Sequence, residues 1–350
     1  MIKRVGIITI IDNDNYGNRL QNYAVQVILN RLGKNPVTLL NDEYSNDKTK
    51  FLLRCLRYRH TKKNNGYSSN SARRINFERF NSRICFSRRK TYPFSHGDCD
   101  AYVVGSDQVW NPNIARLSDV DLLCFAKGKR KVSISASIGV SDLSEKYALK
   151  LKKGLQDFYA ISLREKEGEE LVERISPGKK PITLIDPTMM LTRDEWDKIA
   201  GITYVGKKYV LCYFLGGISG ELGQRTKTFL RVNLLEVINL LDKNSKWYES
   251  GPSEFISLIR NAEIILTDSF HASVFSLIFE KPFAVYPRSG TKESMNSRID
   301  SLLRKFNARC CAANEKQEID FFAPDYKQVK QVLSAERIRF SEFLENSLGD

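Results

Sequence analysis

The chain has 350 residues, of which 42% are hydrophobic and 27% charged. This composition is globular and excludes a disordered or fibrous protein, and the length suits two domains of about 150 residues each. No apolar run approaches the ~18 residues of a membrane-spanning helix, and the first residues lack a signal-peptide cleavage site. Seven cysteines without a CxxC pair and three histidines without zinc-ligand spacing predict no disulfide framework and no metal site. We therefore expect a cytoplasmic protein.

The net charge of +14 is concentrated in one basic segment. Residues 51–90 contain twelve Lys or Arg, Arg73 among them, against one Glu, and Phe77, Phe80 and Phe86 are interleaved with these cations. We expect an insertion over 48–92, with two short helices, that binds an anionic membrane surface. Nucleic acid is the less favoured partner because no recognised binding motif is present. A solvated insertion without a partner is the other alternative.

The first half of the chain predicts alternating strands and helices. Val5–Ile11 is a continuous apolar run, which is typical of a strand buried on both faces of a parallel sheet. A helical pattern from Leu20 to Leu32 follows and ends at Gly33. Further strands are expected at 36–40, 100–105, 131–138, 160–163 and 182–185, with helices near 143–158 and 165–174.

A second series of strands and helices begins at Tyr209. Strands are expected at 209–215, 235–240, 263–266 and 282–286, with helices near 253–260 and 271–279. With the boundary placed near 190–207, the pattern predicts an α/β fold of two Rossmann-like, doubly wound domains that face a central cleft. The expected units are residues 1–200, residues 205–325, and a helix over 326–350 that packs back toward the first domain.

Ligands of such sheets bind at the carboxyl ends of strands, so the loops there are candidate sites. Loop 13–22 is rich in amide side chains and lacks a GxGxxG fingerprint, which favours a hydroxyl-rich ligand over a polar turn with an Asn cap. In loop 105–112, Trp110 stands beside Asp107 and Gln108, a combination typical of sugar sites. The alternative is a tryptophan that only packs the loop.

Arg164 and His271 are candidates in two further loops. Arg164 follows a strand and precedes a helix, where its planar guanidinium can hold a carboxylate or phosphate; an intrahelical ion pair is the alternative. His271 lies in the first turn of a helix, where the dipole favours an anion and lowers the pKa of the imidazole. The other histidines, His60 and His96, lie in or beside the basic segment, which favours a catalytic rather than a structural role for His271.

A fifth loop combines cations with a helix start. Arg288 follows a strand, and Ser297 and Arg298 begin the next helix. This arrangement is a candidate phosphate cradle, and a surface turn with a helix cap is equally compatible with it.

Taken together, these motifs resemble the polysaccharide pyruvyl transferase family, over residues 14–24, 105–111, 162–165, 186–188 and 267–272. The resemblance implies a GT-B-like fold and transfer of pyruvate from phosphoenolpyruvate onto two sugar hydroxyls, giving a ketal and phosphate, with no metal or other cofactor. It also implies that His271 is the catalytic histidine and that Arg164 binds phosphoenolpyruvate. Many members have Arg-Leu-His where this chain has Ser269-Phe270-His271, so we expect Arg288 or Arg298 to supply the missing guanidinium.

These arguments assign acceptor binding to the first domain and donor binding to the second, with a lipid-linked sugar at the inner face of the membrane as the expected acceptor. A GT-B glycosyltransferase that uses a nucleotide sugar, with Glu280 on a ribose, is the alternative function. The expected catalytic residues are His271 and Asp14; the donor-binding residues are Arg164, Ser269, Phe270, Arg288, Ser297 and Arg298; the acceptor-binding residues are Asn15, Tyr16, Asn18, Asp107, Gln108 and Trp110.

Overall fold

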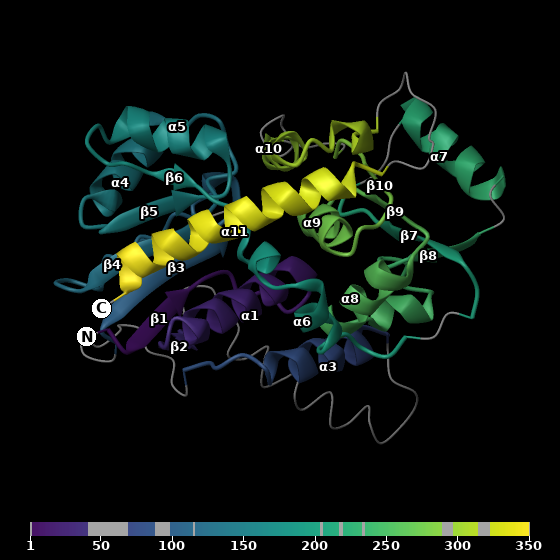
Figure 1. The fold of residues 1–350 in the computed structure, drawn as a ribbon, viewed down its shortest axis with the longest axis horizontal. Coiled ribbons are helices and arrows are strands. Elements are labelled where there is room, and N and C mark those ends of the chain that lie inside the picture. Colours follow the sequence, from purple (N-terminus) through teal and green to yellow (C-terminus); the bar gives the residue numbers. More distant parts are fainter. Residues whose placement is uncertain are drawn as a thin grey trace.

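The computed structural model describes residues 2–40, 69–87, 99–114, 116–203, 206–216, 220–232, 235–288, 297–313 and 323–349. In these ranges the strands form two parallel sheets flanked by helices, as Figure 1 shows. Much of the basic segment, including His60, Arg88, Arg89 and the first helix of the expected pair, lies outside the described residues, as does His96; the second expected helix is described, over Ser69–Asn81.

The first sheet has the strand order β2-β1-β3-β4-β5-β6 in the described residues. Every residue of β3 is buried, because helices such as α1 (Tyr16–Arg31), α4 (Glu145–Leu155) and α5 (Lys166–Ile175) cover the sheet. The strands are β1 (Arg4–Ile8), β2 (Asn35–Thr38), β3 (Ala101–Asp107), β4 (Arg130–Ala136), β5 (Ala160–Leu163) and β6 (Ile182–Thr183).

The second sheet has the order β10-β9-β7-β8 in the same described ranges. Its central strand pairs on both sides, with Val210 opposite Val237 on one neighbour and Ile264 on the other. The short helix α6 (Arg193–Asp197) lies in the connection between the sheets. The strands are β7 (Tyr209–Tyr213), β8 (Glu236–Asn239), β9 (Ile264–Thr267) and β10 (Phe283–Val285), and the helices are α7 (Gly220–Val232), α8 (Pro252–Asn261), α9 (Phe270–Ile278) and α10 (Ser297–Lys305).

Both sheets have the same kind of topological switch point. In each, the first strand along the chain lies between the second and the third: β1 lies between β2 and β3, and β7 lies between β8 and β9. The connections leave such a strand in opposite directions, which opens a crevice at its carboxyl end. The loops at these crevices carry Asp14 and Asp107 in the first domain and Asp268 and His271 in the second.

The two domains meet along a seam where α1 of the first packs against α8 and α9 of the second. Tyr16 at the start of α1 is fully buried there, with its ring stacked on Phe255 at a centroid distance of 4.5 Å. Its hydroxyl donates to the Ser250 carbonyl at 3.0 Å. Side chains of both domains, such as Leu20 and Phe275, belong to one continuous apolar core. The seam is therefore a packed interface.

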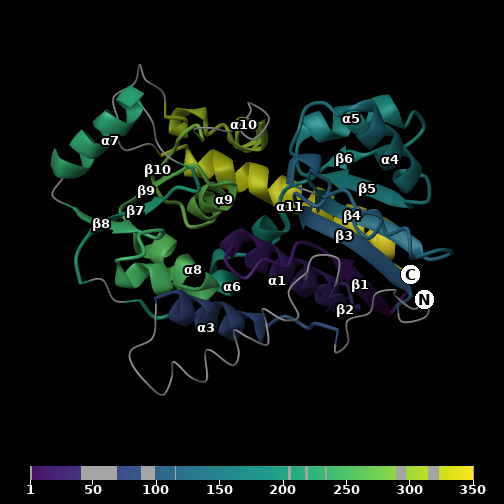
Figure 2. The same ribbon diagram turned by 180° about the vertical axis from the view of Figure 1, so that it is seen from behind.

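Helix α3 (Ser69–Asn81), the described part of the basic segment, lies along this seam beside α1 and α8 (Figure 2). Arg73, Phe77 and Phe80 are all buried. The Arg73 guanidinium donates to the Asp14 carbonyl at 2.9 Å and, across the seam, to the Tyr248 carbonyl at 3.0 Å. The prediction that these three side chains contact a membrane is wrong, because protein atoms already cover them. Phe86 is half-buried against the same core.

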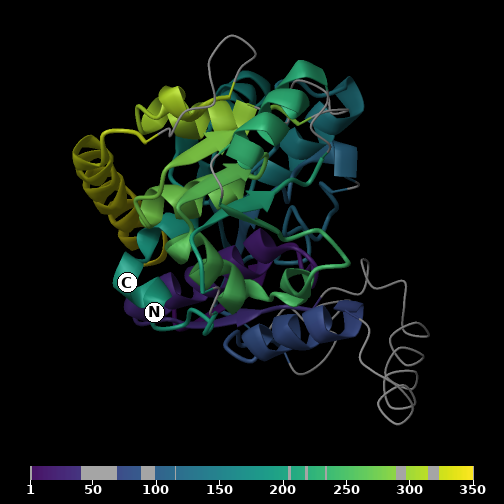
Figure 3. The same ribbon diagram turned by 90° about the vertical axis from the view of Figure 1, so that its right-hand side faces the viewer.

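Helix α11 (Tyr326–Leu348) connects the second domain to the first on a different flank of the molecule from α3 (Figure 3). Near its start, Lys330 pairs with Glu280 at 2.9 Å. Further along, Arg337 donates to the Met189 carbonyl at 2.7 Å, and the Ser347 carbonyl accepts from Arg130 at 3.3 Å. None of the described helices, this long one included, combines the length and apolar character needed to cross a bilayer.

We expect Arg73→Met to lower the free energy of unfolding by about 3 kcal/mol or more, because it leaves buried carbonyls on both domains without a donor. Arg79→Gln on the same helix is the matched control, since it changes an exposed contact with Asn76 and should cost under about 0.5 kcal/mol. Urea unfolding of the two variants measures the difference. Equal stabilities would show that Arg73 does not hold the seam.

Candidate active site

A buried charge cluster, made of Asp107, Arg164, Asp186 and Arg298, lies at the carboxyl end of the first sheet. Arg164 donates to Asp186 Oδ2 at 2.9 Å and to Asp107 Oδ1 at 3.3 Å. Burial alone would raise the pKa of both aspartates, but the Arg164 guanidinium and the hydrogen bonds that the carboxylates accept outweigh it, and the pKa of each lies below its usual value. The cluster therefore keeps both carboxylates charged away from solvent.

Local backbone structure fixes the two aspartates of the cluster. Asp107 ends β3 with φ at +68°, a left-handed conformation that is strained for a non-glycine residue and is often found at functional sites. Its Oδ2 accepts from the Asn18 amide, and its Oδ1 accepts from the Gln108 N–H at 2.8 Å. Asp186 follows β6 and caps the next turn, where the Thr188 N–H donates to Oδ1 at 2.9 Å. Neither carboxylate can rotate away from Arg164 without losing these donors.

His271 enters this cluster from the second domain, in the first turn of α9. Its Nε2 lies 3.7 Å from Asp186 Oδ2 and has no hydrogen-bond partner among the described residues. Gly17 permits this approach, because a Cβ at that position would lie 2.0 Å from His271 Nδ1. Burial lowers the pKa of the imidazole below its ordinary value of 6.5, although Asp186 and Asp107 oppose the shift. The imidazole is therefore neutral at pH 7 in the free protein.

Arg298 and Phe270 complete the surroundings of Arg164. Arg298 is buried on α10, and its two terminal nitrogens lie 2.8 and 2.6 Å from the side-chain amide of Gln108. Burial, followed by repulsion from Arg164, lowers the pKa of Arg298 to about 10. The Arg164 guanidinium lies 4.3 Å above the Phe270 ring. Arg298, one of the two guanidiniums expected from the sequence, is thus brought into the cluster.

Arg288, the other expected guanidinium, lies at the second switch point. It pairs with Asp268 at 3.1 Å, and that carboxylate also accepts from the backbone N–H groups of Leu215 and Gly216 at 2.6 and 2.7 Å. Ser269 is occupied as the N-cap of α9, where its hydroxyl accepts from the Ala272 N–H at 3.4 Å. Ser297 begins α10.

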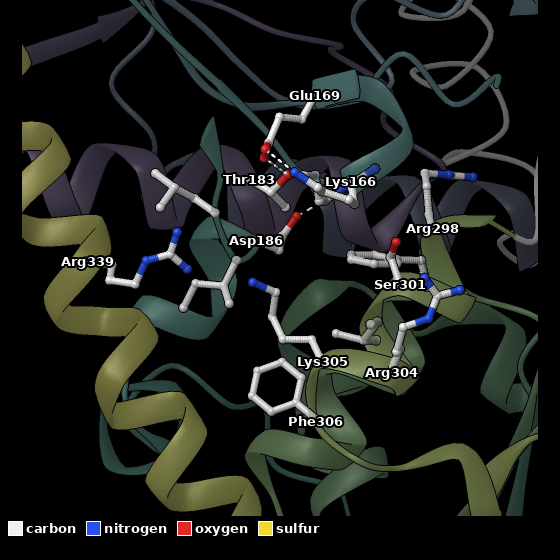
Figure 4. A pocket seen from close by; sticks show the side chains of 15 residues that line it. Lys166, Glu169, Thr183, Asp186, Arg298, Ser301, Arg304, Lys305, Phe306 and Arg339 are labelled. Atoms are coloured by element: carbon white, nitrogen blue, oxygen red, sulfur yellow. Dashed lines mark hydrogen bonds and ion pairs between the residues drawn. The ribbon is translucent and has the colours of Figure 1, made fainter. Parts of the chain in front are cut away.

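A cationic pocket of about 420 Å³ opens beside the cluster. Figure 4 shows side chains that converge on it from α5, α10 and α11. Arg164, Asp186, Phe270 and Arg298 form its buried end. The other lining residues are Lys166, Glu169, Thr183, Leu184, Ile185, Ser301, Leu302, Arg304, Lys305, Phe306 and Arg339.

The structure corrects two acceptor-site predictions. Trp110 does not present its ring for stacking on a sugar: the side chain is fully buried, and its Nε1 donates to the Asp121 carbonyl at 3.0 Å. The alternative, a tryptophan that packs the loop, is correct: the loop after β3 is held to the next strand end, where the Trp110 N–H donates to the Ser137 carbonyl at 3.1 Å. Tyr16 is likewise buried in the seam, so neither ring can contact an acceptor.

The amide-rich loop after β1 is largely satisfied within the protein. Asn15 caps α1 by accepting from the Asn18 N–H at 3.2 Å. Gln21 donates to Thr9 at 2.8 Å and Gln26 to Thr38 at 2.9 Å. These amides have partners within the protein, so their density alone does not indicate a hydroxyl-rich ligand, and the assignment of Asn15 and Asn18 to the acceptor stays a prediction. Asp14, by contrast, is 83% exposed at the rim of the site.

No function was assigned to Asp186 or Glu165 from the sequence, but both hold other residues of the site in place. The Asp-Pro-Thr sequence after a strand is the signal for Asp186, since Asp before Pro is a typical N-cap pattern. Glu165 Oε1 accepts from the backbone N–H groups of Ile138 and Gly139 at 2.8 and 3.0 Å. Because Glu165 binds these backbone groups, it does not pair with Arg164 within the helix, which was the alternative role of Arg164. The partners of Arg164, Asp107 and Asp186, lie at the ends of two other strands.

Comparison with solved structures defines the class of this fold. S. aureus MnaA, determined with UDP, matches at 12% identity and a TM-score of 0.50, over 99% of this chain and 91% of that one. A putative UDP-N-acetylglucosamine 2-epimerase from Listeria monocytogenes matches at 9% identity and a TM-score of 0.52, over 99% and 92%. The chain has a GT-B-type fold of two Rossmann-like domains, which confirms the predicted architecture.

The sequence comparison identifies the family within this class. A family profile described as polysaccharide pyruvyl transferase matches residues 15–290, which include the loops at both switch points. The chain belongs to the polysaccharide pyruvyl transferase family, as its motifs predicted. Comparison with curated protein sequences gives no significant match.

We expect Gly17→Ala to displace the His271 imidazole, because the added Cβ would overlap Nδ1. His271 should then react with diethyl pyrocarbonate at least several-fold faster than in the parent protein, as measured by mass spectrometry of the modified peptide. Asn30→Ala, at an exposed position of the same helix, is the control and should leave the rate unchanged. An unchanged rate in Gly17→Ala would mean that the imidazole is not held against α1.

The lowered pKa of His271 predicts a pH-dependent stability. Between pH 6.5 and the lower pKa of the folded protein, the unfolded chain binds a proton on this side chain and the folded protein does not. The free energy of unfolding should therefore fall as pH falls below about 6.5. Urea unfolding at pH 7.5, 6.5 and 5.5 should show a smaller decrease in His271→Asn than in the parent protein. Parallel curves would contradict the buried, neutral state of this imidazole.

Proposed function

We propose that this protein transfers the pyruvyl group of phosphoenolpyruvate onto two hydroxyls of one sugar, forming a ketal and releasing phosphate. The observation that carries the proposal is the position of His271. Its Nε2 is unpartnered among the described residues, lies beside Asp186, and faces a cluster that contains two buried guanidiniums. A proton donor beside bound cations is what protonation of an anionic enol ether requires.

In the proposed reaction His271 acts first, as a general acid. Protonated His271 gives its proton to the methylene carbon of phosphoenolpyruvate, which becomes a methyl group, while the adjacent carbon becomes oxocarbenium-like. One sugar hydroxyl adds to that carbon and returns its proton to the imidazole. The bond from this carbon to the phosphate oxygen then breaks, the second hydroxyl adds, and its proton leaves with the phosphate. Phosphoenolpyruvate and a diol thus yield a ketal and hydrogen phosphate with no oxidant or reductant.

The charge cluster supports this role in two ways. Arg164 and Arg298 each have a buried Nε without a hydrogen-bond partner in the described part of the chain, so both retain donors for the carboxylate and phosphate of the substrate. An anionic substrate at this position also favours the imidazolium, and Asp186 acts in the same direction. Substrate binding therefore opposes the burial that keeps His271 neutral in the free protein.

The acceptor is proposed to enter past Asp14 and Gln108, toward the buried Asp107. Of these, Asp14 is the most exposed, and Gln108 is half-buried beside Arg298. We assign to this acceptor a sugar of a lipid-linked polysaccharide precursor at the cytoplasmic side of the membrane. For the nucleotide-sugar alternative, Glu280 would have to exchange its surface pair with Lys330 of α11 for a ribose hydroxyl.

The direct test is phosphate release from phosphoenolpyruvate in the presence of sugar acceptors. We expect His271→Ala to retain the fold and to lose a factor of about 10² or more in kcat, the usual scale of general-acid catalysis. Lys153→Gln, at an exposed position of α4, is the control. Near-parental turnover in His271→Ala, measured together with a circular dichroism melt, would end the assignment.

The pH dependence separates an acid from a merely structural histidine. Because the acid form of His271 is required, kcat/KM for phosphoenolpyruvate should fall as pH rises above the lowered pKa of this imidazole. Asp186→Asn removes the carboxylate that raises this pKa, so the falling limb should move to lower pH. A limb that does not move would show that Asp186 acts on folding alone.

A further inference from the structure

The cationic pocket carries more positive charge than the proposed reaction of phosphoenolpyruvate uses. Six cationic side chains line it, against two carboxylates. Lys166 pairs with Glu169, whereas Lys305 and Arg339 share a single carboxylate, Glu336, at 2.9 and 2.5 Å. Arg304 makes no hydrogen bond or ion pair with any residue in the described ranges. Among the lining side chains the cations therefore outnumber the carboxylates, and within the described ranges Arg304 has only the electrostatic influence of Asp300 one turn before it.

Two buried polar atoms also point to a ligand. Arg298 and Arg164 line the pocket, each is more than nine-tenths buried, and the Nε atom of each has no hydrogen-bond partner in the part of the chain that the structure describes. Leaving a buried donor of a charged group without a hydrogen bond costs free energy. In the proposed reaction these two groups hold phosphoenolpyruvate at the buried end of the pocket, so the outer cations Arg304, Lys305 and Arg339 are left for a second anion.

The pocket extends beyond the position of proton transfer. His271 does not line it, whereas its neighbours Phe270 and Asp186 do. Arg304, Lys305 and Arg339 line its outer part and have no role in the proposed binding of phosphoenolpyruvate. Figure 4 shows these three cations on two helices that face each other across the opening.

The size and lining of the pocket indicate what the anion is attached to. Its volume of about 420 Å³ is several times that of a bare phosphate, and Leu184, Leu302 and Phe306 supply apolar wall beside the cations. We infer that this pocket is a second anion subsite, which binds the phosphate or diphosphate ester of the acceptor while phosphoenolpyruvate is bound beside His271. This inference rests on the proposed function for the identity of its substrate, but the binding of an anion here does not.

Isothermal titration calorimetry with inorganic pyrophosphate tests the subsite without requiring catalysis. We expect one pyrophosphate to bind per chain, with nearly the same affinity in the absence and presence of saturating phosphoenolpyruvate. Arg304→Gln should weaken pyrophosphate binding about tenfold, the effect of one charge-assisted contact. Since Arg304 is exposed, this variant should fold normally. Lys152→Gln, an exposed lysine on α4, is the control and should bind as the parent does.

The outcomes distinguish this proposal from the proposed function. Competition between pyrophosphate and phosphoenolpyruvate would overturn the second subsite, since the pocket would then be the donor site. No pyrophosphate binding, or equal binding by Arg304→Gln and its control, would also overturn it. Binding of pyrophosphate that depends on Arg304, together with no binding of phosphoenolpyruvate, would support the subsite and overturn the proposed function.

Discussion

The site depends on one guanidinium held between two carboxylates. Arg164 joins Asp107 at the end of β3 to Asp186 after β6, and the imidazole of the second domain is placed against the same Asp186. Removing one partner of such a buried ion pair typically costs 3–5 kcal/mol, because the remaining charge is left uncompensated. For this reason a change at Arg164 alters the shape of the site as well as its charge, and lost activity in such a variant cannot be assigned to donor binding alone.

The architecture was predictable because it is encoded in short-range patterns. Continuous apolar runs such as Val5–Ile8 indicated strands covered on both faces, and each was followed by a helical period, so the two parallel sheets follow. The helix of the basic segment was misjudged for the opposite reason. Its cations suggested an exposed surface, but Arg73 finds its partners on residues 57 and 175 positions away, which no local pattern reveals.

The same distinction applies to the site. Residues fixed by their place at a strand end, His271 and Arg164 among them, were predicted because parallel strands bring their carboxyl ends to one edge. The acceptor-binding predictions for Trp110 and Tyr16 failed because residue type alone does not distinguish a buried ring from one that is exposed to a ligand. The motif that contains Asp186 was recognised in the sequence, but no function was assigned to this residue. Its function depends on contacts with Arg164 and Thr188 that form only in the folded sheet.

The contacts that close the seam have a consequence for the order in which this protein folds. Tyr16 and Ser250 are 234 residues apart in the chain, and Arg130 and Ser347 are 217 apart. Contacts of such high sequence separation form slowly, because the loop-closure entropy must be overcome before they contribute. Each sheet, whose parallel pairs join nearer neighbours, can therefore form first, and the site is completed only when the finished halves dock. A half-folded chain would have both sheets but no binding site between them, and would expose the apolar faces around Phe255 and Leu20 to aggregation.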